Sequence, residues 1–120
     1  MLTTNAKERK QIPICTGVLD YFPDAIAEVA RVSKIGNDQH NPGEPLHWNR
    51  GKSMDQADCV VRHLMERDGI DDDGMYHLAK ACWRLLADLQ IKIEKDRGLP
   101  ISRGSKPYKE PGSVKEAKNG

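Results

Sequence analysis

Apolar residues recur with the period of an α-helix in three segments of the chain, and this periodicity constrains the fold more than any other feature. No segment alternates apolar and polar residues for more than a few positions, so the sequence offers no clear strand. Pro23 opens the first segment, and Ser53 and Gln56 have the spacing of a capping box at the start of the second. The sequence therefore predicts an all-α fold, a small bundle of three main helices. The predicted helices span residues 23–35, 52–68 and 74–97 and are followed by Gly36, Gly69 and Gly98.

A long connection, residues 36–51, separates the first two predicted helices. Connections of this length without their own structure are usually either functional or disordered, and Trp48, with His40 and His47 in the same segment, favours function. Three helices of this size make a thin bundle, whose apolar stripes a second subunit would cover better than a loop. We therefore expect a long functional loop and a fold completed by homo-oligomerisation.

The chain of 120 residues has the size of one domain, and 38% of its residues are hydrophobic, which is enough for one compact core. We expect a partly extended N-terminal segment (residues 1–19), a helical domain (residues 20–98) and a basic, disordered tail (residues 99–120). No apolar run approaches the ~20 residues that span a bilayer, so no membrane insertion is expected. The net charge of +1 argues against binding double-stranded nucleic acid, and three cysteines without a CxxC pair fit a reducing cytoplasm.

Two pairs of carboxylates have spacings that place both members on one helical face. Asp24 and Glu28 are four residues apart, and Asp55 and Asp58 are three residues apart. Two such helices facing each other could hold Mg²⁺, which prefers oxygen ligands. The alternative is a solvated face of opposite-charge pairs, because Arg62 follows Asp58 by four residues. The residues alone leave both interpretations open.

His63 and His77 lie near the margins of the apolar stripes of the second and third predicted helices. A histidine in such a position is either a hydrogen-bonded part of the packing or a group that binds ligand. Trp48 and Arg50 in the long connection could stack on a base and pair with phosphate oxygens, or Trp48 could cover the bundle as a lid. These alternatives also stay open at the level of the residues.

Short motifs in a fixed order resemble a known family over about residues 14–94. With this order and spacing, the chain is similar to the phage and prophage dATP/dGTP diphosphohydrolases, relatives of the MazG-like all-α nucleoside triphosphate pyrophosphohydrolases. It departs from the family pattern in the four-residue spacing of Asp24 and Glu28, in the order Trp48-Asn49, and in having Gln39-His40 where family members tend to have Lys-Tyr. The motifs are Ala27-Glu28-Val29-Ala30-Arg31-Val32, Lys34-Ile35-Gly36, His47-Trp48-Asn49-Arg50-Gly51, Asp58, Arg62-His63-Leu64, Gly69, Asp71, Gly74 and His77-Leu78.

The resemblance implies a metal-dependent enzyme of the bacterial host cytosol that cuts a (deoxy)purine nucleoside triphosphate between the α and β phosphates. Mg²⁺, or Mn²⁺, would polarise the α-phosphate and activate a bound water. Its implied ligands are Asp24, Glu28, Asp55 and Asp58, with Glu28 and Asp58 as the central pair. The other implied roles are orientation of the triphosphate or the water by His63 or His77, neutralisation of phosphate charge by Lys34, Arg50 and Arg62, and contact with the nucleotide by Trp48 and Asn49.

Two other functions fit the sequence. A phage helical module could bind a host protein through its loop and basic tail without catalysis, which predicts that Glu28 and Asp58 tolerate alanine. A different nucleotide enzyme on a helical scaffold, such as a monophosphate kinase without a P-loop, would need two nucleotides and would release no pyrophosphate.

Overall fold

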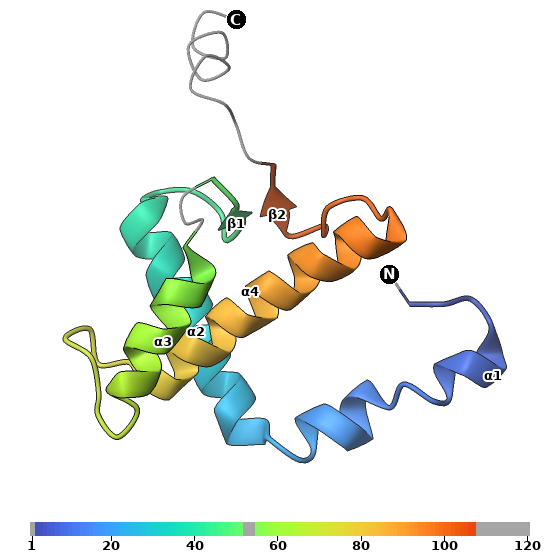
Figure 1. Cartoon of the computed structure of the whole chain (residues 1–120), viewed down its shortest axis with the longest axis horizontal. Coiled ribbons are helices and arrows are strands. Elements are labelled where there is room, and N and C mark those ends of the chain that lie inside the picture. Colours follow the sequence, from blue (N-terminus) through green and yellow to red (C-terminus); the bar gives the residue numbers. More distant parts are fainter. Residues whose placement is uncertain (1, 52–54, 108–120) are drawn as a thin grey trace, which may run out of the picture.

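The computed structural model describes residues 2–51 and 55–107, and helices dominate it (Figure 1). The predicted all-α fold is confirmed, and the three predicted helices are all present as α2, α3 and α4. Two short strands form a small parallel pair beside them, in which Trp48 is opposite Ser105. The elements are α1 (Ala6–Arg9), a π-helical turn η1 (Cys15–Leu19), α2 (Pro23–His40), β1 (Trp48–Asn49), α3 (Gln56–Met65), α4 (His77–Arg97) and β2 (Ser105–Lys106).

The helix α4 is the longest and central helix, and α2 and α3 both pack against its N-terminal part (Figure 1). The α3–α4 pair is the more extensive of the two. Most of the apolar residues buried at the centre are small, which lets the helix axes approach closely but leaves few large side chains in the core. The buried apolar residues are Cys59, Val60, Met75, Ala79, Ala81 and Ala87.

The helix α2 begins at Pro23, as predicted, but the expectation that Gly36 ends it is wrong. Gly36 has a helical backbone, and the chain remains helical for another turn, to His40. The next residue, Asn37, is buried; its side chain donates to the carbonyl of Glu44 (3.1 Å) and accepts from Asn41 Nδ2 (3.2 Å). The helix therefore ends where a polar side chain can bind the departing loop, and not at the glycine.

Helix α4 starts later in the chain than the sequence pattern indicates, and α3 ends earlier, at Met65 and not at residue 68. The capping residue Ser53 and the expected helix start lie outside the described residues, and α3 runs from Gln56 to Met65. Residues 66–76 form a turn closed by a hydrogen bond from the Asp71 amide to the Met75 carbonyl (2.8 Å). This turn delays α4 to His77, because the backbone at Gly74 is left-handed (φ 81°). Gly98 ends α4 in the left-handed conformation (φ 62°), as the sequence predicts.

In the N-terminal segment, which the sequence predicts to be partly extended, the structure forms two short helical turns, α1 and η1, joined by residues in neither helix nor strand. Asn5 caps the first of them by accepting a hydrogen bond from the Glu8 amide (3.1 Å). The segment leaves the three-helix body (Figure 1), and its apolar side chains, among them Ile14 and Leu19, are exposed. In a single chain this arm buries little of its apolar surface.

The chain after α4 folds back onto the long loop. Glu94 accepts hydrogen bonds from both terminal nitrogens of Arg50 (2.8 Å for Nη2), from the Ser102 amide (2.9 Å) and from Gln90. The Arg50 Nε group also donates to Ser105 Oγ (2.9 Å). This buried cluster holds β2 beside β1, so residues 99–107 are packed on the body. The remainder of the expected disordered tail lies outside the described residues.

One side of α4 carries large apolar residues that no part of the described chain covers. Leu78, Cys82, Leu85 and Leu89 recur at helical spacing, and the three leucines are about half exposed, at 47–54%. We call this the α4 apolar face. No helix in the described part of the chain is both long and apolar enough to cross a membrane.

Candidate functional site

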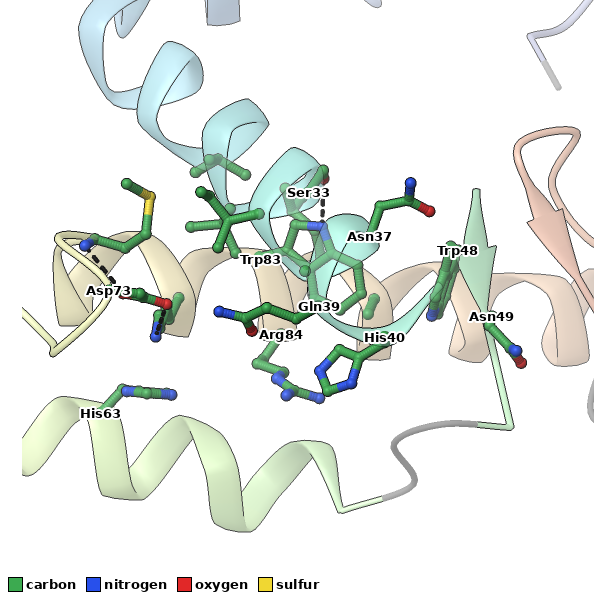
Figure 2. A pocket seen from close by; sticks show the side chains of 18 of the residues that line it. Ser33, Asn37, Gln39, His40, Trp48, Asn49, His63, Asp73, Trp83 and Arg84 are labelled. Carbon is green, nitrogen blue, oxygen red and sulfur yellow. Dashed lines mark hydrogen bonds and ion pairs between the residues drawn. The ribbon is translucent and has the colours of Figure 1, made fainter. Parts of the chain in front are cut away.

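A pocket of about 930 Å³ lies between α2 with the loop that follows it, the C-terminal part of α3, and α4 (Figure 2). Its volume is within the range of small-molecule sites. In Figure 2, His63 and Asp73 lie at one end of the pocket, Arg84 is in the middle, and Trp48 and Asn49 lie at the other end. The pocket therefore has an ionisable end and an aromatic end.

The ionisable end contains two histidines that face each other. His63 comes from α3 and His77 is the first residue of α4, and their Nδ1 atoms are 2.9 Å apart. Asp71 Oδ2 lies 4.0 Å from the His77 Nδ1 atom, and Glu66 Oε2 lies 3.6 Å from its Nε2 atom. His77 is 7% exposed, so its ring is held in place by the surrounding protein.

Lys80, one turn after His77 on α4, neutralises the acidic loop at this end of the pocket. Its ammonium group lies 2.6 Å from Asp71 Oδ2 and 2.7 Å from Asp73 Oδ2. The hydrogen bond from Lys80 lowers the pKa of Asp71, and the Asp72 amide adds to this effect. Burial lowers the pKa of His63, and the positive charge of Lys80 acts in the same direction. At neutral pH the end therefore offers an ionised carboxylate beside a neutral imidazole.

Three of the donor atoms at this end are close enough to share an ion. One atom each from His63, Asp71 and His77 lie within 4.8 Å of one another, and among residues 2–51 and 55–107 this is the one such group of three or more. Two imidazole nitrogens and a carboxylate are a donor set that zinc and similar cations accept. No geometry of this kind is formed by carboxylates alone in the part of the chain that the structure describes.

The four carboxylates that the resemblance assigns to Mg²⁺ lie away from the pocket. Asp24 and Glu28 are on α2, and Glu28 pairs with Arg31 (3.1 Å) on the same helix. Asp55 precedes α3 and Asp58 lies in its first turn, and both side chains are exposed. Among the described residues, no three of these carboxylates lie close enough to share one ion, and their role as Mg²⁺ ligands stays a prediction.

The residues expected to bind nucleotide are divided between the pocket and the surrounding structure. Trp48, Asn49 and Arg62 line the pocket together with the two histidines. Lys34 is exposed on α2 and pairs with Asp38 (2.7 Å). Arg50 lies behind the pocket wall, where its guanidinium group is 9% exposed and pairs with Glu94.

The aromatic end is built around two tryptophans. The rings of Trp48 and Trp83 meet edge to face with centroids 5.8 Å apart, and the Arg50 guanidinium lies 4.1 Å from the centroid of the Trp48 ring. Trp83 donates from Nε1 to Ser33 Oγ (2.6 Å), which ties α4 to α2. Trp48 is half-buried and contributes both to the pocket lining and to the packing of the loop on α4.

A family model described as dATP/dGTP diphosphohydrolase, N-terminal, matches residues 3–98. The chain belongs to this family. No curated protein and no solved structure matches the chain. Of the residues that line the pocket, Ser102 and Gly104 fall beyond the family match, and all others fall within it.

The sequence patterns missed five charged residues of the pocket, Glu66 after α3, Asp71 and Asp73 in the turn, and Lys80 and Arg84 on α4. The spacing of the last two was a usable signal, because residues three and seven positions after His77 lie on one helical face with it. Aspartates shortly before a helix are ordinary capping residues, and Asp73 does accept a hydrogen bond from the Met75 amide (3.1 Å). Their second role depends on the fold of the turn.

Proposed function

We propose that this protein hydrolyses a (deoxy)purine nucleoside triphosphate, dATP or dGTP, to the monophosphate and pyrophosphate in the pocket described above. The family match and the order of side chains along the pocket support this proposal. Ionisable groups gather at one end, Arg84 is in the middle and aromatic rings lie at the other end. This is the order in which a nucleotide presents its phosphates, sugar and base.

The single observation that carries the proposal is the set of cationic side chains that lines the pocket from the ionisable end to its middle. Arg62, Lys80 and Arg84 all line the pocket, and guanidinium and ammonium groups bind phosphate oxygens with charge-assisted hydrogen bonds. A triphosphate bound beside them would place its base near Trp48 and Asn49. The tryptophan offers apolar contact to any base, whereas the amide of Asn49 can donate to and accept from a base edge.

We assign orientation of the attacking water or the triphosphate to the pair of histidines. His63 lines the pocket and can hydrogen-bond to either of them through a ring nitrogen. His77, fixed between His63 and Glu66, orients that ring. In this proposal Arg50 acts indirectly, since its guanidinium supports the ring of Trp48 while pairing with Glu94.

The proposed Mg²⁺ site and the oligomer belong together. No three of the carboxylates Asp24, Glu28, Asp55 and Asp58 gather around one point within the described chain. In this proposal a second copy completes the site by bringing α2 of one subunit to α3 of another. The α4 apolar face offers a surface for such an assembly, because its leucines are half exposed in the single chain. Lys34, exposed on α2, would reach phosphate only in the same assembly.

The test is an assay of pyrophosphate release from dATP, dGTP, dCTP, dTTP and ATP, with Mg²⁺, Mn²⁺ or EDTA. We expect release only with metal, faster from the purine deoxynucleotides, and lost in His63→Gln. The variant Lys92→Gln is a matched control on α4, because this exposed lysine pairs with Asp96 on the surface of the helix and lies outside the pocket.

Two further variants separate the parts of the proposal. Full metal-dependent turnover in Glu28→Gln and Asp58→Asn would refute the carboxylate site and leave the pocket as the site of reaction. No release from any nucleotide, with protein shown to be folded by circular dichroism, would refute hydrolysis and favour the non-catalytic binding module.

A further inference from the structure

We propose that His63, His77 and Asp71 bind one transition-metal ion of the Zn²⁺ or Co²⁺ class at the ionisable end of the pocket. The three residues come from α3, from the start of α4 and from the turn between them, so the fold and not local sequence brings them together. This ion is distinct from the Mg²⁺ that the carboxylates of α2 and α3 are proposed to hold. Its binding stands on the geometry below and does not depend on the proposed hydrolysis.

The distances between the donor atoms are close to those that a metal requires. Ligands of a tetrahedral ion at ~2.1 Å from the metal are ~3.4 Å apart. The two histidine nitrogens are 2.9 Å apart and Asp71 Oδ2 lies 4.0 Å from His77. Around an ion the distance between the histidines would lengthen by about half an ångström, and the distance from Asp71 to His77 would shorten by about as much. Small side-chain rotations allow both changes.

The position of Glu66 is a second observation that points to metal binding. Its carboxylate lies 3.6 Å from Nε2 of His77, the ring nitrogen on the opposite side from His63. A carboxylate beside the outer nitrogen of a liganding histidine fixes its tautomer, so that the inner nitrogen presents its lone pair to the metal. His63 supplies the second nitrogen, because its Nδ1 atom lies 2.9 Å from that of His77. The hydrogen that one Nδ1 atom donates to the other moves to the far nitrogen of its own ring when the ion binds.

The chemistry of the donors decides the class of ion. Imidazole nitrogens suit zinc, cobalt, nickel and iron, whereas Mg²⁺ prefers six oxygens in a regular octahedron. The cluster contains a mixed nitrogen and oxygen set with three protein ligands, which leaves a fourth position for water or a ligand in the pocket. Use of that position by a phosphate oxygen is the one part that rests on the proposed function.

Substitution of Lys80 offers a second test, in which metal affinity should rise and not fall. Its ammonium group shares Asp71 Oδ2 with the prospective ion, so it competes electrostatically with any cation bound there. Asp73 provides Lys80 with an alternative partner when Asp71 turns to the metal. Removing the charge in Lys80→Met should therefore tighten metal binding several-fold, while removal of a ligand should weaken it.

The experiment is a titration of the EDTA-treated, full-length chain without a polyhistidine tag. Co²⁺ binding is followed by visible absorption and Zn²⁺ binding by calorimetry, each in excess Mg²⁺. We expect one ion per chain, a tetrahedral cobalt spectrum, weakening by more than about tenfold in His63→Gln and Asp71→Asn, and weakening of about tenfold in Glu66→Gln. Asp71 lies in a turn outside the helices, so its variant keeps the test open if the histidine variant fails to fold.

The matched control is His47→Gln, because this histidine lies in the loop beside Trp48 and its Nδ1 atom contacts the Pro45 carbonyl (2.8 Å). Three outcomes would overturn the proposal. The first is loss of metal binding in His47→Gln, and the second is unchanged metal binding in both His63→Gln and Asp71→Asn. The third is the absence of Co²⁺ and Zn²⁺ binding to the wild-type protein. Pyrophosphate release with Mg²⁺ but no Co²⁺ binding would refute this site alone. Stoichiometric Co²⁺ binding without any pyrophosphate release would refute the hydrolysis and leave the metal site standing.

Discussion

The substitution Glu94→Gln tests the buried ion pair that attaches the long loop to α4. Glu94 and Arg50 are 7% and 9% exposed at their side chains, and the carboxylate also accepts the Ser102 amide. Glutamine has the same shape without the charge, so the variant resembles the protonated wild-type protein. Any difference between the two proteins therefore measures what the ionised carboxylate contributes to folding.

The magnitude follows from the pKa of this carboxyl group. Hydrogen bonds from Arg50 lower the pKa of Glu94 from its usual 4.5 to about 2, against the opposing effect of burial. Each pKa unit corresponds to ~1.4 kcal/mol, so the ionised group adds ~3 kcal/mol to the free energy of unfolding at pH 7. Because the folded pKa is the lower one, this contribution is complete above pH ~4.5 and is lost as the pH falls towards ~2.

Urea denaturation of both proteins between pH 7 and pH 2.5, followed by circular dichroism, measures the effect. We expect Glu94→Gln to be less stable by ~3 kcal/mol at pH 7, with the gap closing progressively below pH 4.5. Asp96→Asn is the control on the same helix, because its pair with Lys92 is exposed and should change stability by less than ~0.5 kcal/mol. A gap below ~1 kcal/mol at pH 7, or one that stays constant down to pH 2.5, would refute this account.

Four further outcomes are expected. Gly36→Ala should raise the free energy of unfolding by up to ~1 kcal/mol in urea titrations, because the position is helical and no atom lies within 4 Å of the added methyl group. Trp83→Phe should lower it by ~1 kcal/mol or more, since the hydrogen bond to Ser33 is lost, and an unchanged midpoint would contradict that role. Arg62→Gln should raise KM for dATP about tenfold or more in the pyrophosphate assay, with unaltered circular dichroism. Leu85→Asp should reduce the molecular mass measured by sedimentation without loss of helix; equal masses for the wild type and the variant would argue against assembly through the α4 apolar face.

The fold could be predicted from the sequence because it depends mostly on local signals. Helical periodicity and end signals such as Pro23 and Gly98 act within a few residues, and both of these ends are confirmed. The errors came where distant contacts override local preference. Gly36 stays helical because Asn37, one residue later, finds buried partners in the loop, and α4 starts late because the turn before it closes on itself.

The candidate site was predictable only in part, for a geometric reason. The two histidines and Trp48 could be selected as chemically capable residues, but their distances depend on how α3 and α4 pack. His63 and His77 are 14 residues apart in the chain, and only the turn between the helices brings their rings together. The carboxylate spacing on α2 and on α3 indicated that each helix carries half of a metal site. The described chain does not bring the two pairs of carboxylates together.

The packing of residues 102–106 on the loop has a practical consequence for how this protein is produced and compared. The family match ends at residue 98, before Ser102 and Ser105, whose amide or hydroxyl groups bind Glu94 and Arg50. A fragment cut at that boundary would retain every helix yet remove partners from two buried charges, which is a costly change in a small domain. The pocket wall behind Trp48 would loosen, and a poor nucleotide affinity measured on such a fragment would reflect the cut and not the pocket of the full chain.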